Sequence, residues 1–154
     1  MIDKTKKMGF FTKKKIEDDF ISEINLDLNT FQYIHTEKNK SGSEFKVYRK
    51  TLSELQFGIF SIIEIYQFND GSKNVFLTSD INNTNYDLLK LIVNRLVNKY
   101  GSDFLGSGIL DEEEIDNIAI NNFWSGRTWD KVSPVISIDG IDEEFFRLSI
   151  LGLN

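Results

Sequence analysis

Two side chains of this sequence have the types that acid–base chemistry needs near neutral pH. His35 is the only histidine in the chain, and imidazole is the side chain whose ordinary pKa lies closest to neutrality. Glu64 is the only charged residue in the apolar run 57–68, so burial could raise its pKa and make it a general base. His35 and Glu64 are therefore the candidate site of a small enzyme or ligand-binding domain. A histidine at a sheet margin and an ion-paired glutamate explain the same residues, and we favour that interpretation.

Other catalytic chemistries lack the residues they require. The chain has no cysteine, which excludes thiol nucleophiles, disulfides and zinc sites built on cysteine. No nucleophile elbow or glycine-rich phosphate loop is present, and Gly106-Ser107-Gly108 is too short and lacks a following lysine. We predict no cofactor, no metal site and no catalytic residue set, so that an enzyme is the minority interpretation.

Five acidic residues crowd one short segment, 111–116. They are Asp111, Glu112, Glu113, Glu114 and Asp116. A divalent cation is one explanation, but the alternating Asp or Asn residues and central glycine of a calcium loop are absent. Acidic side chains at a helix start interact favourably with the helix dipole, so the segment predicts a helix N-terminus rather than a metal site.

The hexapeptide 124–129, WSGRTW, contains both tryptophans of the chain. Tryptophan and arginine are enriched in binding hot spots, and a guanidinium can stack on an indole. Trp124, Arg127 and Trp129 are therefore candidate partner-binding residues. The alternative, which we favour, is that the tryptophans fill the end of the core and that Arg127 pairs with an acid.

The charge of the chain favours a basic partner over nucleic acid. The net charge is −6, but residues 1–15 carry six lysines and one acid, so that residues 16–154 hold 12 basic and 23 acidic residues, a net of −11. An acidic body repels phosphate and suits solubility or a basic protein partner. The connection 139–144, DGIDEE, offers one rim for such a partner, with a charged soluble turn as the favoured alternative. Its candidate residues are Asp142, Glu143 and Glu144.

The elements that position these residues are organised around segment 84–101, where apolar residues recur every three or four positions. Thr84 with Asp87 predicts the start of this helix and Gly101 its end. Two further helices are predicted over 14–25 and 111–123. Aromatic and β-branched residues predict strands over 31–37, 44–50, 57–68, 73–81, 135–138 and 145–151.

The predicted fold class is α+β, with one domain over 16–154 behind a flexible basic arm at 1–15. The first four strands form a meander and the last two a hairpin, and the antiparallel sheet is packed by the N-terminal and central helices.

The run 57–68 has apolar side chains on both faces of its predicted strand. Ile59, Ile63 and Ile65 share one face, and Phe60, Ile62, Tyr66 and Phe68 share the other. An antiparallel sheet with one wet face alternates apolar and polar residues. We therefore expect the second face to be covered by a helix or loop of this chain, or by a partner.

No apolar run approaches the length of about 20 residues that a membrane helix needs, and segment 8–11 is too short for the core of a signal peptide. We expect a cytoplasmic protein without a membrane span.

In size, charge and element order the chain is similar to small acidic immunity proteins that neutralise bacterial toxins. It is also similar to acidic α+β secretion chaperones that dimerise, although it lacks their last helix. The likeness includes no motif. Together with the strand 57–68, the acidic body and the segment 124–129, it favours a non-enzymatic protein-binding module with a basic protein partner or with itself as partner. The acidic charge argues against the binding of nucleic acid.

Overall fold

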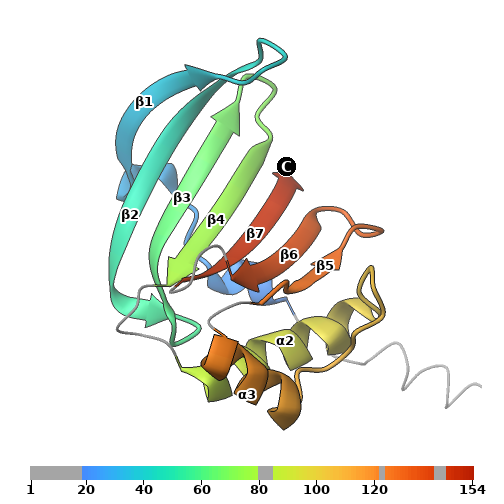
Figure 1. Cartoon of the computed structure of the whole chain (residues 1–154). Helices are drawn as coiled ribbons and strands as arrows, with labels where there is room; N and C mark the ends of the chain where they lie inside the picture. The colour runs from blue at the N-terminus through green and yellow to red at the C-terminus, as the bar shows by residue number, and fades with distance from the viewer. Residues whose placement is uncertain (1–18, 80–84, 122–123, 141–144) are drawn as a thin grey trace, which may run out of the picture.

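The computed structural model describes residues 19–79, 85–121, 124–140 and 145–154. These residues form a seven-stranded antiparallel sheet with helices packed against it (Figure 1), so the predicted α+β class is confirmed. The sheet order is β1-β2-β3-β4-β7-β6-β5. The strands are β1 (Gln32–Lys38), β2 (Glu44–Gln56), β3 (Phe60–Phe68), β4 (Lys73–Ser79), β5 (Arg127–Trp129), β6 (Val135–Gly140) and β7 (Phe146–Leu153). The helices are the 3₁₀ helices η1 (Phe20–Glu23) and η2 (Leu28–Thr30) and the α-helices α2 (Tyr86–Tyr100) and α3 (Glu112–Asn121).

Helix α2 is the element that the sequence defined most sharply, and its ends have physical causes. The side chain of Asn85 accepts a hydrogen bond from Leu88 N at 3.1 Å and caps the start. Gly101 takes a φ of 81° and donates its N–H to Val97 O at 2.7 Å, which closes the helix as predicted. Thr84, the predicted cap, lies outside the described residues.

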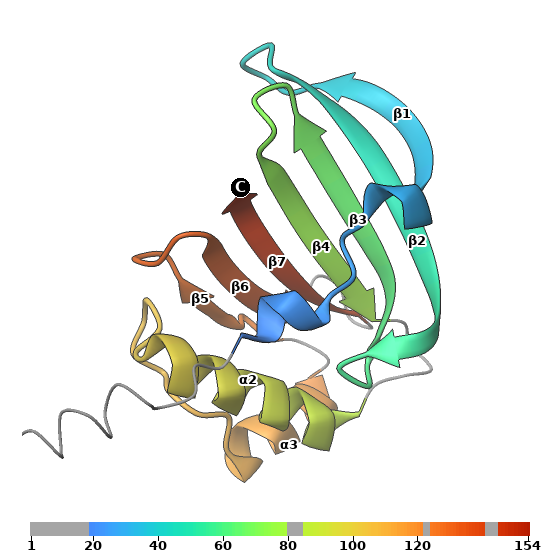
Figure 2. The ribbon, with the colours of Figure 1, turned by 180° about the vertical axis from the view of Figure 1, so that it is seen from behind.

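The main core lies between α2 and one face of the sheet. Leu89 and Val93 of α2 are fully buried, as are Ile63 and Ile65 of β3. Figure 2 shows η1 and α2 in front of this face, which we call the helix-covered face. None of the helices in the described part of the chain is both long and apolar enough to cross a membrane.

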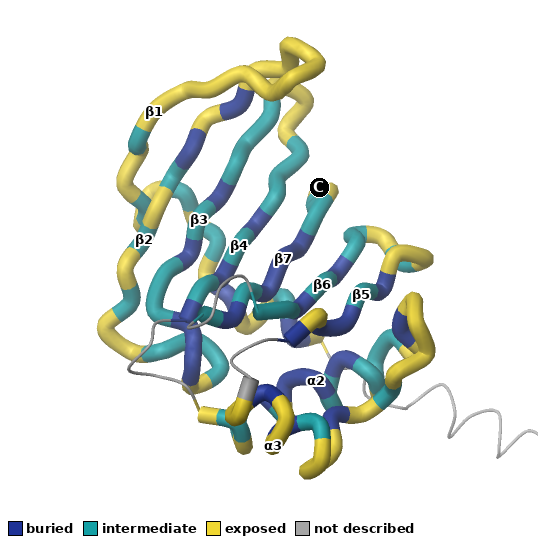
Figure 3. The backbone as a smooth tube through the Cα atoms, viewed as in Figure 1, coloured by how far each residue is buried: buried dark blue, intermediate teal, exposed yellow. Residues whose placement is uncertain are grey.

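Side chains of the opposite face, which we call the open face, are mostly half-buried (Figure 3). In the described part of the chain, no helix lies over the upper part of this face (Figure 1). Phe45 and Val47 are 9% and 2% exposed but do not belong to the main core. They are buried by neighbours on their own face, where the Phe45 ring stacks on Tyr66 with centroids 4.9 Å apart.

Several predicted elements differ from the structure. Of the helix expected over 14–25, residues 14–18 lie outside the described residues and the remainder forms only the short helix η1, because Ile24 has extended dihedral angles. Strand β3 begins at Phe60 rather than Phe57, since Phe57 and Gly58 turn the chain with φ values of 53° and 80°. A bulge between Phe60 and Ile62 then leaves Phe60 fully buried.

The short strand β5 was not predicted. It has three residues, too few for a periodic pattern, and it pairs with β6 through Arg127 opposite Ile138 and Trp129 opposite Ile136. It therefore places the middle of the WSGRTW segment at the edge of the sheet and aims Arg127 and Trp129 toward the helices.

Candidate functional site

A buried arginine organises the region where β5, α3 and the segment after α2 meet. The side chain of Arg127 is 1% exposed and forms a bidentate pair with Glu114, with Nη2 to Oε1 at 2.6 Å and Nη1 to Oε2 at 2.8 Å. Trp124 donates its indole N–H to the same carboxylate at 2.9 Å. Both oxygens of Glu114 are therefore satisfied by fixed donors, which makes the group a rigid unit.

Helix α3 brings Glu114 to this position. The Asp111 side chain accepts a hydrogen bond from Glu114 N at 2.8 Å and so caps the helix start. Ile115 and Ile118 are buried and hold the helix against the core. The hydrogen bonds from Arg127 keep the pKa of Glu114 below its usual value, although burial alone would raise it.

The same buried groups fix the backbone of residues 101–110, which we call the 101–110 loop. Arg127 donates from Nε to Gly108 O at 2.8 Å, and Trp129 donates its indole N–H to Gly101 O at 2.9 Å. Phe104 donates its backbone N–H to Thr128 O at 2.7 Å. The loop is thus tied to β5 near both of its ends and at its middle.

Asp103 stabilises the 101–110 loop through hydrogen bonds to the backbone of the loop itself. It is 5% exposed, and its carboxylate accepts the backbone N–H of Gly108 at 2.8 Å. Burial would raise the pKa of Asp103, but the backbone N–H groups of Gly108 and Ser107 outweigh burial and hold the pKa below its usual value. A buried, ionised carboxylate bonded to its own loop predicts one loop conformation rather than many.

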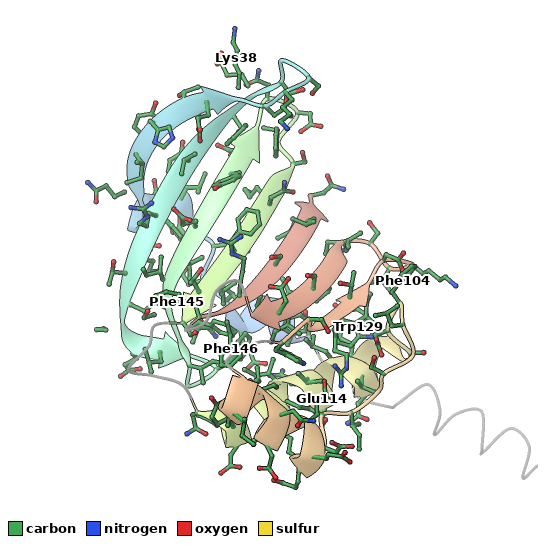
Figure 4. The ribbon with its side chains drawn as sticks, viewed as in Figure 1. Lys38, Phe104, Glu114, Trp129, Phe145 and Phe146 are labelled. Atoms are coloured by element: carbon green, nitrogen blue, oxygen red, sulfur yellow. The ribbon has the colours of Figure 1, made fainter. Side chains whose placement is uncertain are left out.

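The 101–110 loop presents large apolar side chains to solvent. Phe104 and Leu105 are 67% and 73% exposed, and Ile109 is 56% exposed. Figure 4 shows Phe104 at the outer edge of the molecule, with Trp129 and Glu114 on the inner side. Two adjacent exposed apolar residues on a fixed loop form an apolar patch, and such patches are common at interaction sites.

A hollow of about 410 Å³ adjoins this pair. Its apolar lining comes from Tyr100, Phe104, Leu105, Trp129 and Val132, and its polar lining includes Asp103, Asp130 and Lys131. Phe104 and Leu105 thus project from the surface at the border of a recess.

The candidate residues Trp124, Arg127 and Trp129 are brought together, but in the interior. They are 4%, 3% and 2% exposed, so their side chains offer a partner almost no surface. Their geometry matches the favoured alternative, in which the tryptophans fill the end of the core and Arg127 pairs with an acid. A contact with a partner anywhere on this segment stays a prediction. Asp142, Glu143 and Glu144 lie outside the described residues.

Glu64 and His35 both belong to the open face, but they do not meet. Glu64 accepts two hydrogen bonds from Arg49, at 2.7 and 2.9 Å, while His35 Nε2 lies 3.0 Å from Glu37 on its own strand. The tryptophans lie on the helix-covered side, so no catalytic group forms from these residues and an indole. The carboxylate of Glu64 thus has Arg49 as its ion-pair partner, and a site at Glu64 and His35 stays a prediction.

The acidic start of α3 serves the helix and its neighbours. Asp111 caps the helix, Glu112 pairs with Lys90 at 2.8 Å and Glu114 pairs with Arg127. Within the described ranges, no group of three or more histidine and acidic side chains is arranged to hold a metal ion.

Two features of the site were not predicted from the sequence. The 101–110 loop looked like a flexible glycine-rich connection, and its one signal was the pair Phe104-Leu105, which has no periodic role in any predicted element. The partner of Arg127 could not be identified among the many acids of the chain, because the pairing with Glu114 depends on how α3 docks.

Comparisons with known proteins give no relative. A scan of protein-family models, a search of curated proteins and a search of solved structures each found no match to this chain. The function therefore has to be argued from the geometry alone.

Proposed function

We propose that this protein is a non-enzymatic protein-binding module that docks a basic partner through the 101–110 loop. The observation that carries the proposal is the exposure of Phe104 and Leu105, at 67% and 73%, on a loop that buried groups hold in place. A preformed loop loses little conformational entropy when it binds, so apolar burial by the partner is retained as affinity. Burying a side chain of this size contributes about 1.5–3 kcal/mol.

The charge around the loop determines the kind of partner. Residues 101–121 contain six acidic residues and no basic one. Asp103 and Glu114 are used inside the protein, and Glu112 is paired with Lys90, but Asp111, Glu113 and Asp116 are exposed. The partner that fits is a protein with an apolar pocket surrounded by lysines or arginines.

Two biological roles use such a surface. An immunity-like protein would bind one basic toxin in a fixed ratio, whereas a secretion-chaperone-like protein would also associate with itself. The alternative function, an enzyme or ligand-binding domain with a carboxylate site at Glu64 and His35, has less support, since Glu64 is neutralised by Arg49.

The test compares three forms of the tagged, full-length protein in capture from its own cells. These are the unmodified protein, the loop variant F104S/L105S and the control variant L91S/I120S. The control removes two apolar residues that are equally exposed, at 63% and 76%, but lie on α2 and α3. Bound proteins are quantified by mass spectrometry, and the mass of each complex is measured by light scattering.

The expected result is one basic partner that the unmodified protein and the control retain, and that the loop variant loses by about tenfold or more. If a dimer forms instead and only the loop variant abolishes it, self-association is the function of the loop. A partner retained equally by all three forms, or a monomer that binds nothing, would refute the proposal.

A further inference from the structure

Arg147 differs from the other arginines of the chain. There are four arginines, and three of them pair with a carboxylate: Arg49 with Glu64, Arg95 with Glu23, and Arg127 with Glu114. Arg147 forms no ion pair and no hydrogen bond with any residue that the structure describes, and its Nε is buried without a partner. Arg147 is half-buried as a residue, and its guanidinium carries donors that no described residue uses.

The position of Arg147 gives that anion a defined setting. In strand β7 it lies opposite Thr78 of β4 and opposite Asp139 of β6, and paired residues of antiparallel strands point to the same side. This side is the open face. The guanidinium lies over the Phe76 ring, 5.5 Å from its centroid, which orients it by a cation–π contact.

Aromatic rings continue from Phe76 across the open face. The centroid of Phe76 lies 4.9 Å from that of Tyr66, and Tyr66 lies 4.9 Å from Phe45. These three rings form a continuous apolar floor across strands β4, β3 and β2, and Arg147 stands at one end of it.

Two hydroxyl groups lie on the open face near the guanidinium. Ser149 of β7 lies opposite Phe76 of β4 and opposite Ser137 of β6, so both serines point to the open face beside Arg147. Serine hydroxyls donate and accept hydrogen bonds and can complete the coordination of an anion held by an arginine.

We propose that Arg147 anchors a binding site for a small organic carboxylate on the open face, with the apolar body of the ligand lying on Phe76 and Tyr66. A planar guanidinium matches a carboxylate through two parallel hydrogen bonds. An apolar floor with a few convergent polar groups is the usual composition of a ligand site. The site is on a different surface from the 101–110 loop, so it does not depend on the docking function.

Asp139 is the acidic group that competes with such a ligand. Burial raises the pKa of Asp139, and the positive charge of Arg147 on the neighbouring strand offsets part of that rise. Among the described residues, Arg49, Glu64 and Glu37 are the other charges that act on Tyr66, and Arg49 forms an ion pair with Glu64. Removing the charge of Asp139 should therefore strengthen carboxylate binding, whereas removing that of Arg147 should abolish it.

The experiment is a titration of the ¹⁵N-labelled full-length protein with 2-naphthoate, followed by amide chemical shifts. The neutral isostere 2-naphthamide is titrated in parallel. The variants are R147Q, R147K and D139N. The matched control is R49Q/E64Q, which removes an arginine of the same face together with its ion-pair partner. Dispersed amide spectra show that each variant is folded.

The expected result is saturable binding of naphthoate, with shifts confined to β3, β4, β6 and β7. Naphthamide should bind about tenfold or more weakly, and R147Q should lower the affinity for naphthoate to that of the amide. The affinity of R147K should fall between those of the unmodified protein and R147Q, because lysine lacks the planar guanidinium that forms two parallel hydrogen bonds. D139N should bind naphthoate more tightly, and R49Q/E64Q should change the affinity less than about threefold. Equal binding of acid and amide, unchanged affinity in R147Q, or no saturation would overturn the proposal.

Discussion

The pair formed by Arg127 and Glu114 gives the sharpest test of how the 101–110 loop is held. Arg127 is 1% exposed, and its two shortest hydrogen bonds, at 2.6 and 2.8 Å, go to Glu114. E114Q keeps the shape of the side chain but leaves the buried cation without its counter-charge. Breaking a buried pair in this way costs about 3–5 kcal/mol.

The structure places the expected cost of E114Q at the lower end of that range. Gln can still accept one hydrogen bond, and Arg127 retains Gly108 O at 2.8 Å, so we expect a loss of about 3 kcal/mol in the free energy of unfolding. R127M should lower the free energy of unfolding by a similar amount. Glu114 is 32% exposed and can be hydrated, which limits the loss, but Gly108 O loses its hydrogen-bond donor, which adds to it.

The double variant R127M/E114Q measures the coupling energy between the two side chains. When both charges are removed, neither is left buried alone, so the double variant should lose about 4 kcal/mol rather than the sum of about 6, a coupling of about 2 kcal/mol. The measurement is urea unfolding followed by far-ultraviolet circular dichroism. Tryptophan fluorescence is not used, because Trp124 donates a hydrogen bond to Glu114 and the variants would change its surroundings directly. Single losses that add within about 0.5 kcal/mol would refute the paired arrangement.

Two further predictions concern acid stability and backbone geometry. Glu114 and Asp103 have lower pKa values in the folded protein than their ordinary values of about 4.3 and 3.9, so the folded state binds fewer protons. Their stabilisation is complete above those ordinary values and is lost as the pH falls through the lower folded ones. Urea midpoints measured from pH 7 to pH 2 should show this acid loss, and E114Q/D103N should flatten it; an unchanged slope would exclude these groups as its source. In G126A, the added Cβ would lie 2.1 Å from Ile138 O at a φ of 84°, which should cost about 3 kcal/mol or more. G71A also has a positive φ, of 88°, but open space around the new atom, so its expected cost is only about 1 kcal/mol; similar melting temperatures for the two variants would contradict the close packing of β5 on β6.

Local chemistry made helix α2 predictable from the sequence. Its apolar stripe is long and regular, and Gly101 ends it at the position where a left-handed residue is needed. The two-sided character of 57–68 was also visible, and the residues from Ile62 onward divide between the faces as the alternation indicates. Such features depend only on spacing along the chain.

The candidate sites could not be predicted because they depend on contacts between distant segments. Glu114 and Arg127 come from a helix and from a strand of three residues, and only the docking of α3 brings them together. The significance of Arg147 lies in the absence of a partner among the described residues, which no spacing can indicate. The candidate hot-spot residues of WSGRTW were chosen by residue type, and type alone does not distinguish a side chain that contacts a partner from one that supports a neighbouring loop.

The docking role of the 101–110 loop is tested most directly by photo-cross-linking from within it. A photoreactive phenylalanine analogue is placed at position 104, and in a matched control at position 91, which is also exposed but lies on α2. The proteins are irradiated in their own cells, and the adducts are identified by mass spectrometry. We predict one discrete adduct with a basic protein, or with a second copy of this chain, from position 104 and none from position 91. No adduct from position 104, or the same adducts from both positions, would contradict the proposed function.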